Sequence, residues 1–349
     1  MHRVNSLIGL ILLAGLATGL GQSAEEFFAN NIVIDGTGAP NKRAGSALHI
    51  YPRSPDGSSD FAELIESAGV NVSILSIRNY ESLANWNRQI ESGRYRNLRI
   101  VREFGDLETA YKNKEYALVF YVQTPWPLGG RVEPIKEWYD DGLRLFQIVY
   151  GSTFPVAAED KLGTGCSRED PDDESDGLTS LGQKVVAELN RLNMIVDVSH
   201  CNRQTTLDTI ALSKTPVVAT HAGCAELTPV KRNKSDEEIR AIAKSGGVFG
   251  VTPIGWMLTE DRDSVSIDDF VKHLEHAISV GGIDHVAIST DGPRNGWTAE
   301  SGHYPGELMD SERRWFHLYD ALKKRGHSNE DLAKIFGRNW LRVLKQVLD

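Results

Sequence analysis

The sequence is short of cysteine and of positive charge, and each shortage excludes a class of protein. Its 349 residues contain three cysteines, Cys166, Cys201 and Cys224. These are too few for a disulfide scaffold, although an oxidising compartment would permit one bridge. Asp and Glu (48) outnumber Lys and Arg (38), so the formal net charge is −10. Nucleic acid is therefore not an expected partner, because binding to a phosphate backbone requires a basic surface.

Long apolar runs are also missing, with one short exception near the N-terminus. Leu7–Leu20 is apolar, the basic pair His2-Arg3 precedes it, and small or polar residues follow at positions 21–24. A membrane-spanning helix needs about 20 apolar residues. The pattern instead predicts a cleavable signal over residues 1–24, a mature protein in the periplasm or secreted, and no stable membrane anchor after cleavage.

The remaining chain, residues 25–349, alternates short β-branched runs with helical patterns and predicts a single domain. Near-continuous apolar strands of this kind are typical of a parallel sheet covered by helices on both faces. No Gly-rich phosphate loop follows any of them, which weakens the alternative of a doubly wound open sheet. We therefore expect an α/β fold, the (β/α)8 TIM barrel. The expected strands are Ile32–Asp35, Asn71–Ile77, Ala117–Val122, Arg144–Val149, Met194–Ser199, Pro216–Thr220, Gly247–Thr252 and His285–Thr290. Capping boxes starting at Ser180 and Ser235 predict two of the helices.

Three potential metal ligands follow strands of the expected barrel. His200 ends the fifth strand, His221 the sixth and Asp291 the eighth. The C-terminal ends of barrel strands meet at one mouth, where these enzymes carry out their chemistry. Imidazole nitrogen and carboxylate oxygen are ligands that zinc accepts. The three residues therefore indicate a divalent metal site.

At these residues the sequence resembles the membrane (renal) dipeptidase family, strongly over about residues 140–349. The resemblance is carried by Gly177-Leu178-Thr179, Met194-Ile195-Val196-Asp197-Val198-Ser199-His200, Thr220-His221, Lys231-Arg232-Asn233, Gly246–Val251, Gly282-Ile283-Asp284-His285-Val286, Ser289-Thr290-Asp291 and Gly337-Arg338-Asn339-Trp340. It implies a metal-dependent barrel hydrolase with two bridged zinc ions.

The resemblance also implies roles for individual residues. His200 and His221 match the ligands of one ion, and Asp291 matches a ligand of the other. Arg232 falls on the residue that binds the substrate carboxylate, a role that suits a guanidinium because it can form two parallel hydrogen bonds. Tyr150 aligns with the histidine that polarises the substrate, a position where some bacterial relatives carry tyrosine.

Three other ligands expected from the resemblance are missing. After the first strand the family has Asp-Gly-His-Asn-Asp, whose His and last Asp bind the first ion, whereas this chain has Thr37 and Ala39 at those positions. Gln123 stands where a glutamate would bridge the two ions, and a neutral amide cannot take over that role. We therefore expect one zinc ion at most, on His200 and His221, or none.

Two functions remain open. The chain is either a dipeptidase-like hydrolase of dipeptides or similar small amides, with Asp291 as general base and Tyr150 stabilising the oxyanion, or an inactive relative that binds such a molecule. The sequence does not decide between a monomer and a homodimer.

Strand alternation gives two further expectations near His200. It predicts that Asp197 faces the helix layer and that Cys201 points away from His200, as a buried or paired cysteine rather than a ligand. Trp126, Trp256 and Trp297 follow strands and either line a pocket or cover the mouth. The acidic stretch 167–176 is expected to be a solvated loop.

Overall fold

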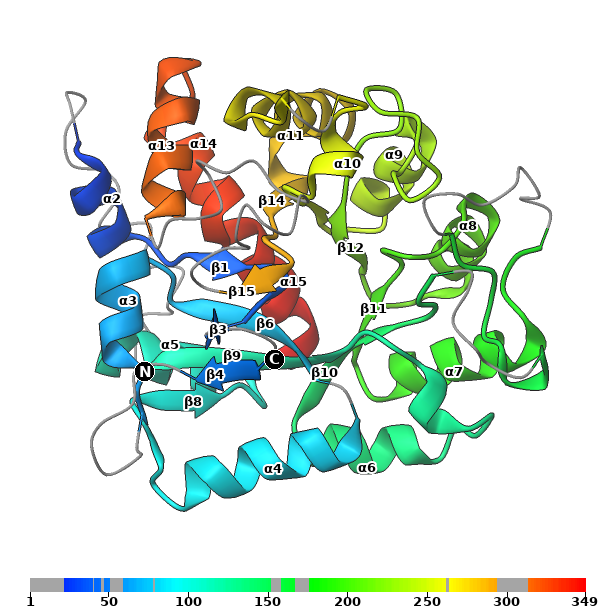
Figure 1. Ribbon diagram of the computed structural model, residues 1–349. Coiled ribbons are helices and arrows are strands. Elements are labelled where there is room, and N and C mark those ends of the chain that lie inside the picture. The colour runs from blue at the N-terminus through cyan, green and yellow to red at the C-terminus, as the bar shows by residue number, and fades with distance from the viewer. Residues whose placement is uncertain are drawn as a thin grey trace, which may run out of the picture.

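The computed structural model describes residues 22–39, 41–44, 47–50, 59–77, 79–151, 158–166, 176–261, 264–293 and 313–349 (Figure 1). The apolar run, most of the acidic stretch 167–176, and Trp297 lie outside these ranges. Within the described ranges no helix has the length and apolar character needed to cross a membrane.

Eight parallel strands form a nearly closed barrel, which confirms the predicted α/β fold. Their order in the sheet follows the chain, β1-β6-β9-β10-β11-β12-β13-β14, and the backbone N–H of Gly36 donates to the carbonyl of Ile288, at 3.1 Å, across the remaining gap. The strands are β1 (Ile34–Asp35), β6 (Val72–Ile77), β9 (Tyr116–Val122), β10 (Leu143–Gln147), β11 (Ile195–Asp197), β12 (Val217–Ala222), β13 (Phe249–Val251) and β14 (Val286–Ile288).

Each of the eight expected strands is present, with small shifts at the ends. β9 is buried at every position, as expected for a parallel strand with the barrel interior on one side and helices on the other. The capping box at Ser235 is confirmed. The one at Ser180 is wrong by one residue, because Thr179 is the N-cap and its hydroxyl accepts from the backbone of Gly182.

Helices cover the outside of the barrel (Figure 1). They are α2 (Ala24–Asn30), α3 (Ala62–Ala68), α4 (Tyr80–Glu91), α5 (Phe104–Asn113), α6 (Pro134–Asp140), α7 (Ser180–Arg191), α8 (Arg203–Leu212), α9 (Asp236–Lys244), α10 (Gly255–Leu258), α11 (Ile267–Gly281), α13 (Arg314–Lys324), α14 (Asn329–Ala333), the π-helical turn η6 (Lys334–Arg338) and α15 (Asn339–Leu348). The short helix α2 packs its Phe27 and Phe28 against Tyr319 of α13.

Part of the barrel interior is filled by an apolar cluster that continues onto the C-terminal helix. Tyr121, Leu145 and Ile195 from three strands belong to the same buried cluster as Trp340 of α15. Trp340 is fully buried. Such a filled barrel is a packed core rather than a pore, so chemistry is confined to the loops at the mouth.

Short additional strands flank the barrel. β8 (Leu98–Ile100) pairs with β9, β3 (Asn41–Ala44) pairs with β4 (Ala47–Ile50), and β5 (Ser59–Asp60) pairs with β7 (Tyr95–Arg96). At the mouth, β2 (Gly38–Ala39) pairs in parallel with β15 (Gly292–Pro293). This last pairing joins the segment after the first barrel strand to the segment after the eighth.

Candidate functional site

His200 and His221 reach the mouth through local departures from regular strand geometry. β11 ends at Asp197, and His200 lies in the turn that follows. β12 carries a bulge. Ala219 pairs with Phe249 and Ala222 pairs with Val251, so an advance of three residues along β12 corresponds to an advance of only two along β13. A bulge redirects the side chains it contains. Here it brings the Thr220 hydroxyl within 2.8 Å of Nδ1 of the neighbouring His221.

The two imidazoles converge through their Nε2 atoms, which lie 3.1 Å apart. Two nitrogens that are each about 2.0–2.1 Å from one tetrahedral zinc ion would lie roughly 3.3 Å apart, so the pair fits two positions of a single ion. Burial, with the nearby positive charge of Arg232, lowers the pKa of both imidazoles well below its usual value. Both rings are therefore neutral near pH 7, the form in which histidine binds metals.

Gln123, directly after β9, joins this pair. Its side-chain Nε2 lies 3.1 Å from Nε2 of His221, and its Oε1 lies 3.3 Å from the hydroxyl of Ser76. The residue thus occupies the position that the resemblance assigns to a bridging glutamate, and contacts the expected ligand through an amide.

The prediction that Asp197 faces the helix layer is wrong. Its carboxylate lies inside the barrel and accepts hydrogen bonds from the hydroxyls of Ser199, Thr220 and Tyr121 and from two backbone N–H groups. Regular alternation does not extend from Asp197 to His200, because the strand ends between them. Asp197 therefore shares a face with Ile195 in the interior. Cys201, in contrast, is buried among residues that pack toward the helices, as expected.

Arg232 is 3% exposed and holds together the two segments that carry the histidines. One terminal nitrogen donates to the carbonyl of Ser199 and the other to the carbonyl of His221, at 3.0 Å. A guanidinium has five N–H donors, so these two bonds leave donors for a ligand. The residue both joins these two segments and places a buried positive charge that acts on His200 and His221.

Tyr150 and Asp291 complete the mouth. The Tyr150 ring stacks on the His200 ring, with centroids 4.4 Å apart. Burial raises the pKa of Tyr150, and the charge of Asp291 adds to this shift. Burial also raises the pKa of Asp291 to about 7, against the opposing effect of Arg232. Asp291 adopts a left-handed backbone (φ 46°) and its N–H donates to the carbonyl of Thr37, at 2.6 Å.

A cavity of about 100 Å³ lies beside Tyr150, between the segments that follow β9 and β10 and residues 160–165. Its lining is mostly apolar, with Pro125, Ile148, Val149 and Leu162 among the residues that contact it. The cavity is large enough for a small apolar side chain. Trp256 packs against the core instead.

The residues near the first strand form a different arrangement. Asp35 accepts from the backbone and hydroxyl of Thr290, and the guanidinium of Arg314 lies 3.8 Å from its carboxylate. Both partners are at least 97% buried. Burial raises the pKa of Asp35, and Arg314 counteracts the rise. Thr37 contributes its carbonyl to Asp291 and no metal-binding side chain.

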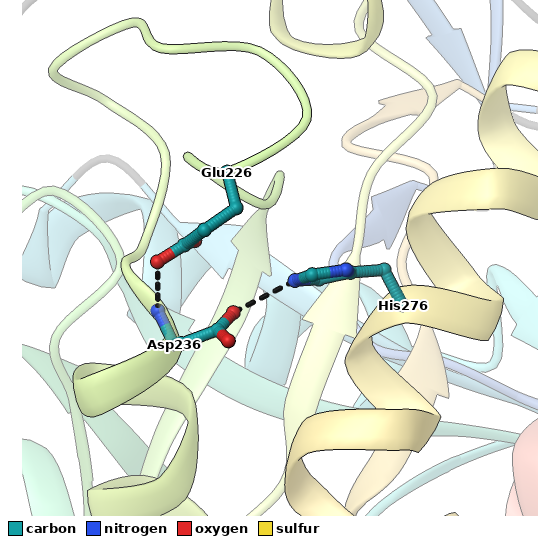
Figure 2. Close-up of side chains that lie close together, drawn as sticks. All are labelled: Glu226, Asp236 and His276. Carbon is teal, nitrogen blue, oxygen red and sulfur yellow. Dashed lines mark hydrogen bonds and ion pairs between the residues drawn. The ribbon is translucent and has the colours of Figure 1, made fainter.

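One set of three His, Cys, Asp or Glu side chains in the described part of the chain has ligand atoms all within 4.8 Å of one another, and it lies outside the mouth. Figure 2 shows this set, Glu226, Asp236 and His276. Asp236 accepts from His276 at 2.7 Å and from Arg240 at 3.0 Å, while its N–H donates to Glu226. These bonds use both Asp236 oxygens and tie the start of α9 to α11. Sequence reasoning missed the set, because its members lie far apart in the chain.

Because that set is the sole one in the described part of the chain, the ligand atoms of Asp291, His200 and His221 do not all lie within 4.8 Å of one another. The three cysteines, all described, are buried thiols and form no disulfide. Burial raises the pKa of Cys201 and Cys224. These thiols stay protonated and are poor metal ligands in this state.

Comparison with known proteins agrees with the geometry. The model of the membrane dipeptidase family, peptidase family M19, matches residues 76–349. An uncharacterised protein in the pqqA 5′ region of Klebsiella pneumoniae is 33% identical over 72% of this chain and 89% of its own length. Dipeptidase tcpJ of Claviceps purpurea is 23% identical over 88% of this chain and 67% of its own length.

Solved structures share the barrel over almost the whole chain. An amidohydrolase from Pseudomonas aeruginosa superposes with a TM-score of 0.76 at 25% identity, covering 94% of this chain and 99% of its own. A metallopeptidase from Rhodobacter sphaeroides, solved with a phosphinate mimic of the dipeptide L-Ala-D-Ala, gives a TM-score of 0.73 at 20% identity, covering 91% and 99%. By the extent of the family match, the chain belongs to the membrane dipeptidase family, peptidase family M19, whose members are dipeptidase-like metallohydrolases.

Proposed function

We propose that this protein is an exported dipeptidase-like hydrolase that cleaves dipeptides or similar small amides with one divalent ion, such as zinc, on His200 and His221. The observation that carries the proposal is the 3.1 Å separation of the two Nε2 atoms at the mouth of the barrel. The pair supplies two nitrogen ligands to one ion, and solvent or substrate would fill the remaining positions. When bound, the ion would lower the pKa of a water molecule and polarise the substrate carbonyl.

The other residues of the mouth have roles that suit amide hydrolysis. Asp291, with a pKa of about 7, can accept or release a proton near neutral pH and is the candidate general base. Tyr150 stays protonated and can donate its hydrogen to negative charge that develops on the carbonyl oxygen. Arg232 would use its remaining N–H donors to bind the substrate carboxylate. The cavity beside Tyr150 would accommodate a small side chain of the substrate.

A second candidate function is binding without hydrolysis. The observation that favours it is the amide of Gln123, which contacts the same Nε2 of His221 that an ion would use. In that case the mouth binds a small zwitterion through Arg232, and no metal ion activates a water molecule for hydrolysis. Both functions predict a small-molecule ligand and no nucleic acid.

One experiment separates the two functions. Zinc-supplemented protein is incubated with a mixed dipeptide library while free amino acids are measured, and binding is followed by calorimetry. Turnover that disappears in Asp291→Asn supports the hydrolase, whereas binding without turnover supports the second function. If neither occurs with any dipeptide, both proposals are wrong.

The proposed role of Arg232 is best tested by changing the ligand and leaving the protein unchanged. Arg232→Ala would also release the carbonyls of Ser199 and His221, so its effect would mix two causes. Dipeptides with an amidated C-terminus remove the carboxylate and leave the protein intact. We expect amidation to weaken binding at least tenfold, because a charged pair in a buried setting is lost. Equal binding of both forms would exclude Arg232 as the carboxylate binder.

The export part of the proposal rests on the N-terminal sequence pattern. N-terminal sequencing of protein from its natural producer should find about 23 or 24 residues removed. An intact Met1 on protein in the cytoplasm would contradict export.

A further inference from the structure

We infer that Asp197 is a positioning residue that acts through Thr220 and fixes His221 as the tautomer protonated on Nδ1. The Nε2 lone pair of His221 then faces the mouth. The inference concerns how the chain prepares the metal site of the proposed function, and its use in catalysis rests on that function.

Counting protons around Asp197 leads to this assignment. Oδ1 accepts from the backbone N–H groups of Ser199 and Thr220, at 2.9 and 3.0 Å, and from the Ser199 hydroxyl, at 2.6 Å. Oδ2 lies 2.7 Å from the Thr220 hydroxyl and also contacts the hydroxyl of Tyr121. An ionised carboxylate only accepts hydrogen bonds. The single hydroxyl proton of Thr220 therefore points to Asp197.

The consequence for His221 follows from the same hydroxyl. Its oxygen also lies 2.8 Å from Nδ1 of His221. Because the Thr220 proton is already used, the oxygen can only accept at this contact, and Nδ1 must donate. A neutral imidazole carries one proton. Nε2 of His221 is therefore unprotonated.

The contact of Gln123 with the other ring nitrogen also indicates that Nε2 of His221 is unprotonated. Ser76 donates to the amide oxygen of Gln123 at 3.3 Å, which orients the amide and turns its NH2 group to His221. An NH2 group only donates, so Nε2 of His221 must accept. The two arguments share no atom except those of the ring. Nε2 of His200, 3.1 Å from the same atom, must then be the donor of that contact. An ion must therefore displace both the Gln123 amide and the proton on Nε2 of His200 to use this lone pair.

The tautomer affects metal affinity, because a histidine that binds metal through one ring nitrogen needs the other nitrogen to be protonated and to donate a hydrogen bond. Asp197→Asn is expected to reverse the direction of the hydrogen bond between Thr220 and Nδ1 of His221. The three donors on Oδ1 require the oxygen of the introduced amide at that position, so the amide NH2 group takes the place of Oδ2 and donates to Thr220. The Thr220 proton then turns to Nδ1 of His221, and the histidine must carry its proton on Nε2.

The test is nitrogen NMR of the metal-free full chain labelled with ¹⁵N-histidine, with the His221 signals assigned by comparison with His221→Gln. Wild type is expected to show a protonated Nδ1 and an unprotonated Nε2, and Asp197→Asn the reverse. Zinc affinity, measured by chelator competition, is expected to fall about 10- to 100-fold in Asp197→Asn. A wild-type Nε2 proton, or an unchanged tautomer and affinity in Asp197→Asn, would overturn the inference.

A second pair of variants is informative even if Asp197→Asn does not fold. Thr220→Val preserves the shape of the side chain but removes the hydroxyl, and is expected to lower zinc affinity about tenfold. Thr220→Ser retains the hydroxyl and should bind within about twofold of wild type. Equal affinity of the two variants would refute the role of the hydroxyl. Because no substrate is used, a failure to hydrolyse dipeptides would count against the proposed function alone.

Discussion

The two halves of the barrel mouth differ in whether they carry the side chains that the family uses as metal ligands. On the side of β11 and β12, both imidazoles are present together with the buried network of Asp197, Ser199 and Thr220 that supports them. On the side of β1 and β14, Thr37 and Ala39 offer no ligand, and the chain instead closes on itself through β2, β15 and the Asp35–Arg314 pair. Gln123 lies at the boundary. The contrast is that the side of β11 and β12 keeps the two histidines that the proposed metal site requires, whereas the side of β1 and β14 is held together by backbone pairing and a buried ion pair.

The strongest test of this contrast removes a histidine. His221→Ala should weaken zinc binding by more than about 1,000-fold, because one remaining imidazole cannot hold the ion. Metal content and chelator competition measure the effect. His276→Ala is the matched control, since it removes a histidine from the set shown in Figure 2 and should leave binding intact. Loss of zinc in the control alone would move the site to the start of α9.

The structural half can be tested through its buried ion pair. Arg314→Met should lower the free energy of unfolding by about 3 kcal/mol near pH 7, because the Asp35 carboxylate loses its buried positive partner. Urea denaturation measures the loss. The double variant Asp35→Asn/Arg314→Met should regain much of it, since no unpaired charge remains. Equal stability of the single and double variants would show that charge compensation is not the reason for the pair.

The pKa of Asp291 predicts a pH dependence of stability. The pKa is about 7 in the folded chain and about 3.8 in the unfolded chain, so between pH 4 and 7 the folded state retains a proton that the unfolded state has lost. Stability contributed by this group is therefore lost as the pH rises through that window. In the presence of a chelator, Asp291→Asn should gain about 2 kcal/mol over wild type between pH 4 and pH 6. Asn also tolerates the left-handed backbone at this position.

Denaturation at several pH values checks this prediction. The exposed Asp320 gives a control, because Asp320→Asn should follow the wild-type curve. The two neutral histidines act in the opposite direction. Their pKa values are lowered by folding, so their contribution to stability is lost below about pH 6.5. A difference between Asp291→Asn and wild type that does not change with pH would contradict the raised pKa.

The smallest expected effect is on zinc affinity and comes from substitutions of Gln123, which lies between the two halves of the mouth. Gln123→Glu replaces an NH2 donor by a carboxylate that can face a cation, and should raise zinc affinity about tenfold. Gln123→Ala removes the amide without adding charge and separates the two contributions. If Gln123→Glu binds zinc no better than Gln123→Ala, a carboxylate at this position cannot reach the ion.

The fold was predictable because parallel barrel strands are buried on both sides and therefore appear as continuous apolar runs. All eight runs correspond to strands in the structure. The start of α9, which Ser235 caps, was predictable for a similar local reason, since a capping box involves residues three positions apart. The N-cap of α7 differs by one residue, because Thr179 also has a hydroxyl and takes this position.

The site was predictable only in its residue types. His200, His221 and Asp291 follow strands, and barrel topology brings strand ends to one mouth. Alternation failed for Asp197, because the strand ends there and the chain turns before His200. The contact of Gln123 with His221 joins residues 98 positions apart, and no local pattern encodes such a pair.

By itself, the amino-acid sequence determined the α/β barrel, the family and the presence of Thr37, Ala39 and Gln123 at three positions where the family has metal ligands, because these depend on apolar periodicity and on residue identity. Tertiary structure alone decided which side chains meet: the bulge that turns Thr220 and His221 toward each other, the carboxylate of Asp197 beside Thr220, and the amide of Gln123 on Nε2 of His221. Hydrogen bonds act over about 3 Å, and only the packing of distant strands brings these atoms that close.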